Sequence, residues 1–99
     1  MRRGTTPTHT ITTDADLTGA AVIFLTYQQK GKTILELEDD RMTVTDKDIA
    51  VTLTQEETLS FDEKHDVDIQ IRARFPDGSA VASNIMTTTA AEILKDGVI

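Results

Sequence analysis

Between Val67 and Phe75 the chain alternates strictly between apolar and polar side chains, a pattern that few folds accommodate. Successive side chains of a β-strand point to opposite faces of a sheet, so the alternation predicts a strand with one face in a core and the other in water. The composition agrees, because threonine, a β-branched residue that favours strands, accounts for 17 of the 99 residues. The residues that share the predicted core face are Val67, Ile69, Ile71, Ala73 and Phe75.

A hairpin follows this strand. Pro76-Asp77-Gly78 is a turn sequence in which proline fixes φ and glycine accepts a positive φ, and residues 79–88 have the composition of a returning strand. Comparable short runs lie upstream, separated by acidic or glycine-containing turns. They predict further strands over residues 6–13, 21–29, 33–38, 42–45 and 49–54.

Two of these strands have a predicted position in a sheet. Residues 21–29 begin with apolar side chains on both faces, which predicts a central strand buried on both sides. Pro7 lacks an amide donor for a strand ladder, so residues 6–13 are predicted to lie at a sheet edge.

The sequence also predicts two short helices. Thr54 and Glu57 have the spacing of a capping box, in which each side chain satisfies a backbone donor of the first helical turn, and this predicts a helical turn through about residue 60. Leu59 and Phe61 are then expected to close an open end of the core. Residues 89–95 have the composition of a short C-terminal helix that stops at Gly97.

About seven short strands separated by turns predict an all-β fold, an immunoglobulin-like β-sandwich, with a small barrel as the alternative. Residues 1–99 form a single domain, with residues 1–5 as a flexible basic arm and residues 90–99 as a C-terminal tail. The sequence leaves open whether the tail packs on its own domain or on a partner. Cysteine is absent, so packing alone must stabilise the fold.

Charge and hydropathy exclude several kinds of partner. The net charge of −7 repels a phosphate backbone, so we expect no nucleic-acid partner. No apolar run approaches the roughly 18 residues of a membrane span, and no hydrophobic signal region follows Met1. We therefore expect no membrane partner and a protein made in the cytoplasm, which leaves it only as part of a larger particle.

Residues that carry chemistry are sparse, and we predict no enzyme, no catalytic residue and no cofactor. The two histidines, His9 and His65, have no partnered nucleophile in sequence, and the single glycines form no phosphate-binding loop. Tyr27 is predicted to lie in the core or at its boundary. Four aspartates in turns could offer oxygen ligands to calcium without the spacing of a known loop, so no metal site is assigned. They are Asp39, Asp40, Asp46 and Asp48.

The termini and one edge remain as candidate surfaces for protein partners. Arg2 and Arg3 form a basic arm on an acidic body, and the Pro7 edge can receive a strand from another subunit. Apolar side chains at a chain end are unusual and can be buried by a partner. The predicted partner-binding residues are Arg2, Arg3, Pro7, Ile93, Leu94, Val98 and Ile99.

Four stretches of the chain resemble small proteins encoded in the structural-gene region of phages and prophages of Gram-positive bacteria. These stretches are residues 3–8, 53–59, 69–74 followed by 77–78, and 92–99. The arrangement is also similar to the N-terminal β-sandwich of siphophage upper baseplate proteins, without their receptor-binding extension. The resemblance implies a tail or baseplate component of the virion, assembled in the host cytoplasm, that binds other tail proteins or further copies of itself. The alternative is a carbohydrate- or calcium-binding adhesion module.

Overall fold

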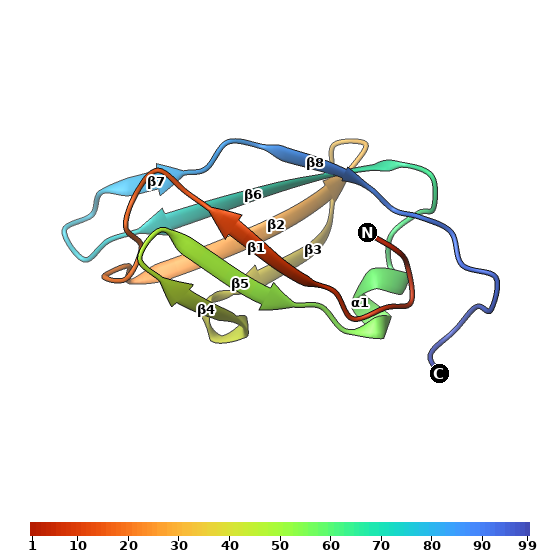
Figure 1. Cartoon of the computed structure of the whole chain (residues 1–99). Helices are drawn as coiled ribbons and strands as arrows, with labels where there is room; N and C mark the ends of the chain where they lie inside the picture. The colour runs from red at the N-terminus through yellow and green to blue at the C-terminus, as the bar shows by residue number, and fades with distance from the viewer.

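The structure, a computed structural model that describes residues 1–99, is an all-β sandwich of two antiparallel sheets (Figure 1). The smaller sheet has the order β1-β5-β4, with β1 at Thr8–Thr12, β4 at Met42–Thr45 and β5 at Asp48–Thr52. The larger sheet has the order β3-β2-β6, and both β7 and β8 pair with the other side of β6. Its strands are β2 at Val22–Gln29, β3 at Lys32–Glu38, β6 at Asp66–Arg74, β7 at Ala80–Ala82 and β8 at Met86–Thr89.

The strand predicted over residues 79–88 is divided into β7 and β8, so eight strands form where about seven were predicted. Ser83 causes the interruption. Its amide donates to the carbonyl of Ile71 at 2.9 Å, while its hydroxyl, in place of a backbone carbonyl, accepts from the amide of Ile71 at 3.0 Å. A side chain that replaces a ladder acceptor displaces the backbone of its strand, and regular pairing resumes only at Met86.

The strand β6 has the predicted core face. Val67, Ile69, Ile71 and Ala73 are buried against the other sheet, and Phe75 packs partly buried at the end of the row. Full burial of an aliphatic side chain of this size contributes about 1.5–3 kcal/mol relative to exposure. The apolar residues of the alternating stretch therefore form the main packing surface of the larger sheet.

The prediction that β2 is buried on both sides is wrong. Its odd-numbered residues, from Ile23 to Gln29, are buried, whereas Val22, Phe24 and the other even-numbered residues are only half-buried. β2 is central in its sheet, between β3 and β6, but no second layer covers the face opposite the core. A central position in a sheet does not imply that both faces of a strand are buried. β2 is central in its sheet but has only one buried face.

The predicted C-terminal helix is also wrong. Residues 86–89 continue the sheet as β8, and residues 90–99 form no helix. Thr87 and Thr89 are β-branched, and their hydroxyls donate to Asp68 at 2.8 Å and Asp66 at 3.2 Å on the neighbouring β6. Ala90 exchanges backbone hydrogen bonds with His65 and Lys64, and Ala91 with Met1 and Arg3. These bonds to distant segments outweigh the weak helix propensity of residues 89–95.

The predicted helical turn is confirmed as α1 at Gln55–Leu59, and a 3-10 turn, η1 at Asp39–Arg41, connects β3 to β4. Phe61, which follows α1, is buried with its ring centroid 5.7 Å from that of Tyr27. The segment that contains α1 therefore closes one end of the core, as expected. The structure contains no helix with the length and apolarity of a membrane span.

Candidate interaction site

All seven predicted partner-binding residues lie at one end of the sandwich. Both chain termini lie beside α1 in Figure 1. We call the surface formed by residues 1–7, α1 and residues 90–99 the terminal face. It contains Arg2, Arg3, Pro7, Ile93, Leu94, Val98 and Ile99.

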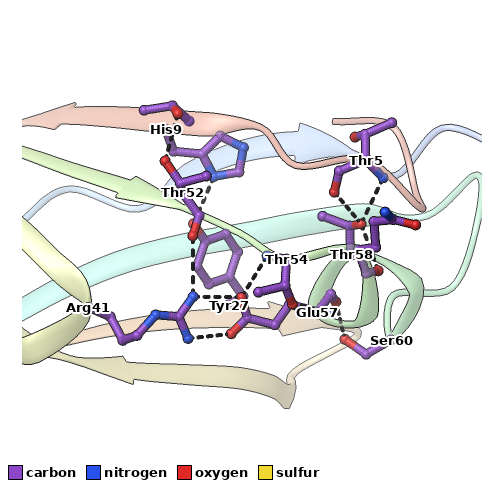
Figure 2. A network of polar contacts seen from close by, with 11 residues as sticks. Thr5, His9, Tyr27, Arg41, Thr52, Thr54, Glu57, Thr58 and Ser60 are labelled. Atoms are coloured by element: carbon purple, nitrogen blue, oxygen red, sulfur yellow. Dashed lines mark hydrogen bonds and ion pairs between the residues drawn. The ribbon is translucent and has the colours of Figure 1, made fainter. Parts of the chain in front are cut away.

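The helix at the centre of the terminal face is stabilised by its predicted capping box. The amide of Glu57 donates to the Thr54 hydroxyl at 3.1 Å, and the amide of Thr54 donates to the Glu57 carboxylate at 2.8 Å (Figure 2). These bonds satisfy donors that the first turn of a helix leaves free. A helix of five residues needs such caps, because isolated helices of this length are unstable.

An ion pair joins α1 to the smaller sheet. Arg41 donates from both terminal nitrogens to the two Glu57 carboxylate oxygens at 2.7 Å each, and also to the carbonyl of Thr52 at 3.2 Å (Figure 2). The Arg41 hydrogen bonds, followed by the amide of Thr54, hold the pKa of Glu57 below its ordinary value. One carboxylate thus serves both the helix cap and the contact between elements.

Beneath this ion pair, the buried phenol of Tyr27 forms a 2.7 Å hydrogen bond with Nδ1 of His9 (Figure 2). Burial raises the pKa of Tyr27 and lowers the pKa of the half-buried His9. The positive charge of the N-terminal ammonium lowers the pKa of His9 further. Every buried polar side-chain atom of the protein has a hydrogen-bond partner. The network is a support for the terminal face.

The two arginines of the N-terminal segment bind backbone carbonyls of their own chain. Arg3 donates to Phe61 at 2.7 Å and to Leu59 at 3.0 Å, and so caps the C-terminal end of α1. Arg2 donates to the carbonyl of Glu92 at 2.6 Å. The sequence predicted a flexible arm over residues 1–5, whereas the structure has this segment bonded to the domain. A role of Arg2 and Arg3 in binding a partner stays a prediction.

The C-terminal segment lies across the terminal face with its apolar side chains divided between two environments. Ile93 is partly buried against Gly4, where an added Cβ would come within 2.8 Å of the Ile93 Cδ1. Gly4 has a φ of +72°, a backbone conformation that favours glycine. Leu94, Val98 and Ile99 have large exposed side chains.

A glutamine anchors the end of this segment. The Gln55 side chain accepts from the amide of Ile99 at 2.9 Å and donates to its carbonyl at 3.2 Å. Between α1 and the segment lies an open hollow of about 560 Å³, bordered by Thr6, Gln55 and Val98. The backbone is thus held to the domain while the apolar side chains stay accessible, and the binding of a partner by these side chains stays a prediction.

The four turn aspartates considered for calcium do not gather into one cluster. The structure contains no group of three or more histidine, cysteine, aspartate or glutamate side chains that could hold a metal ion. The turns at residues 39–40 and 46–48 lie at different places along the smaller sheet and its connections.

Sequence reasoning missed several contacts at this end. Arg41 and Glu57 are 16 residues apart, and no local pattern links them. The same holds for His9 with Tyr27 and for Gln55 with the backbone of Ile99. Tyr27 was correctly assigned to the core, but its hydroxyl partner depends on how the two sheets pack.

No protein-family model, no curated protein and no solved structure matches this chain. The proposed function therefore rests on the geometry of the terminal face.

Proposed function

We propose that this protein is a non-enzymatic assembly module, a tail or baseplate accessory component of a phage or prophage virion that is assembled in the host cytoplasm. Its partners are other tail or baseplate proteins or further copies of itself. The observation that carries the proposal is the exposure of three apolar side chains on the C-terminal segment: 103% for Leu94, 86% for Ile99 and 57% for Val98. Large apolar side chains gathered at one surface favour burial by another protein.

The backbone around these side chains supports the proposal. Gln55 holds the main chain of Ile99, and Gly4 accommodates Ile93, so the segment is already positioned before a partner arrives. Ordering of a free segment costs about 1–2 kcal/mol per residue, and a segment that is held in place avoids part of that cost on binding.

We propose further that the sandwich is immunoglobulin-like, and the strand order supports this. Immunoglobulin domains combine strands A, B, E and D in one sheet and C, F and G, with C′ where present, in the other. With β1 as strand B, the order β1-β5-β4 corresponds to B-E-D, and β3-β2-β6-β7 corresponds to C′-C-F-G. The helix α1 then lies in the connection between strands E and F.

In this assignment no strand corresponds to A, and β1 is an edge that pairs only with β5. Its five residues, Thr8–Thr12, carry no acidic or lysine side chain that would discourage pairing with another chain. The carbonyl of Pro7 accepts from Leu53 at 3.0 Å and fixes the start of this edge. The edge is a second surface at which a neighbouring subunit can add a strand.

The test is incorporation into particles. We would replace Leu94, Val98 and Ile99 together by serine, which keeps the main-chain contact with Gln55, and use Lys95→Ser as the matched control in the same segment. Mass spectrometry of purified particles should find the natural protein and the control in the virion, and should find the triple variant only in the unassembled fraction. Absence of the natural protein from the particles would overturn the proposal.

A further inference from the structure

The face of the larger sheet that points away from the core is partly apolar and hollowed. We call it the outer face; it consists of the even-numbered residues of β2, β3 and β6 together with the adjoining β7. Val22 and Phe24 are half-buried in its centre, with no layer of the protein above them. A hollow of about 380 Å³ lies over them, bordered by Glu36 on one side and by Arg72 and Arg74 on the other.

The strand register arranges the charges of the outer face by sign. Phe24 is paired with Glu38 on β3 and with Arg72 on β6, and Val22 is paired with Arg74. In the row of Phe24 the face therefore runs from an acidic side chain across an aromatic one to a basic one, while farther along β6 the same face carries Asp68 and Asp66, which accept hydrogen bonds from Thr87 and Thr89. Neither Arg72 nor Arg74 takes part in either of the two ion pairs of the protein or donates a side-chain hydrogen bond.

This arrangement complements itself under a two-fold rotation. If two copies stack their outer faces with the axis along β2, the rotation places β3 of each copy over β6 of the other and keeps each row in its position along the strands. Glu38 of one copy then lies opposite Arg72 of the second copy, twice in the pair, and Phe24 lies opposite Phe24. An interface of this kind is isologous, the commonest arrangement of soluble dimers.

We propose that a second copy of the chain covers the outer face in a two-fold symmetric dimer. A purely acidic partner would be repelled by Glu36 and Glu38, and a purely basic partner would be repelled by Arg72 and Arg74. The chain itself supplies both signs in the matching rows. In the part of the face around Phe24 the charges of Glu36, Glu38, Arg72 and Arg74 sum to zero, so two copies that meet there avoid part of the repulsion that the net charge of −7 imposes.

The dimer is independent of the terminal face, which lies at the α1 end, and does not rest on the proposed role in a virion. Opposite charges across an interface govern specificity and register, and the aromatic and aliphatic side chains between them provide the apolar burial. The same chain can thus bind a copy of itself through the sheet and another protein through its terminal face.

The experiment is a charge exchange, followed by the solution mass in light scattering and by sedimentation equilibrium over a range of protein concentrations. Arg72→Glu or Glu38→Arg alone places like charges opposite each other and should raise the dimer dissociation constant by roughly tenfold or more. The double variant with both changes should restore the dimer. Lys47→Glu, in the turn between β4 and β5, makes the same charge change away from the outer face and should have no such effect.

A natural protein that stays monomeric at all concentrations would overturn the inference, and so would a dimer that Arg72→Glu leaves unchanged. Phe24→Ser provides a second variant that should weaken the dimer without a charge change. If the mass falls only in the Leu94, Val98 and Ile99 triple variant, self-association uses the terminal face, which contradicts the inference and leaves the proposed function standing. If the charge exchange behaves as expected and the protein is absent from virions, the dimer stands without the proposed function.

Discussion

The two faces of β2 belong to the same eight residues but differ in burial. Leu25 and Tyr27 point into the space between the sheets and are fully buried, whereas Val22 and Phe24 point outward and stay half-exposed. Both faces are apolar near the start of the strand. The inner face is stabilised by the second sheet within one chain, and the outer face has no intramolecular cover.

The charged groups differ in the same way. At the end of the core that α1 closes, Arg41 and Glu57 form an ion pair with two hydrogen bonds, and His9 binds the hydroxyl of Tyr27. On the outer face, Arg72 and Arg74 have no ion-pair partner. Groups that border the core complete their contacts during folding, while groups on the outer face retain charge and apolar area for a second molecule. Three substitutions test this division.

The largest effect is expected from Leu25→Ala. Removal of a fully buried leucine should lower the free energy of unfolding by about 2–5 kcal/mol, since transfer energy and a residual cavity both contribute. Phe24→Ala, one residue away on the outer face, should cost about 1 kcal/mol or less when measured at concentrations where the protein is monomeric. Urea unfolding of both variants gives the comparison. Equal losses would show that the outer face contributes to the fold as much as the inner face does.

A smaller effect is expected where the core meets its charged border. Glu57→Ala removes the helix cap and the partner of Arg41, and should lower the free energy of unfolding by about 1–2 kcal/mol. Glu56→Ala, the exposed neighbour in the same helical turn, should change it by less than about 0.5 kcal/mol. Thermal melting measures both. A loss in Glu56→Ala as large as in Glu57→Ala would mean that negative charge near the helix N-terminus, rather than the paired carboxylate, explains the result.

The smallest effect is a dependence on pH. Burial lowers the pKa of His9 below its ordinary value of 6.5, so the unfolded chain takes up a proton more readily than the folded protein as the pH falls. The stability that neutral His9 contributes is therefore present above pH 6.5 and is lost as the pH falls through the lowered pKa. His9→Gln should reduce the decrease in urea midpoint between pH 7 and pH 5, a range that lies above the ordinary pKa values of the carboxylates.

The control for this measurement is His65→Gln, because His65 is exposed. That variant should keep the full decrease in midpoint between the two pH values. A decrease of the same size in His9→Gln as in the natural protein would contradict the assignment of the pH effect to the side chain that binds Tyr27.

Local pattern was enough for much of this fold. The alternation from Val67 to Ala73 determined the core face of β6, and the turn at Pro76-Asp77-Gly78 determined the hairpin after it. The spacing of Thr54 and Glu57 determined the start of α1. These features depend on backbone geometry over a few residues, so side-chain type and spacing specify them.

Failures occurred where the deciding partner is distant in sequence. Residues 89–95 have helical composition, but Thr89 pairs with β6, and the backbones of Ala90 and Ala91 bond to residues 64–65 and to the N-terminal segment. The apolar residues of β2 indicated two buried faces, because a sequence does not state how many layers a sheet receives. The candidate residues at the two termini were named from composition, and only the folded chain brought them to one surface beside α1.

The sequence by itself thus determined most of the strands, the hairpin turn after β6, the helix cap and the buried face of β6, since all follow from short-range geometry and side-chain polarity. Only the tertiary structure decided that the outer face stays uncovered, that Arg72 and Glu38 lie two strands apart in one row, and that every buried polar side-chain atom has a partner. The physical reason is that burial, register between non-adjacent strands and charge pairing are properties of surfaces, and a surface forms only when distant segments pack together.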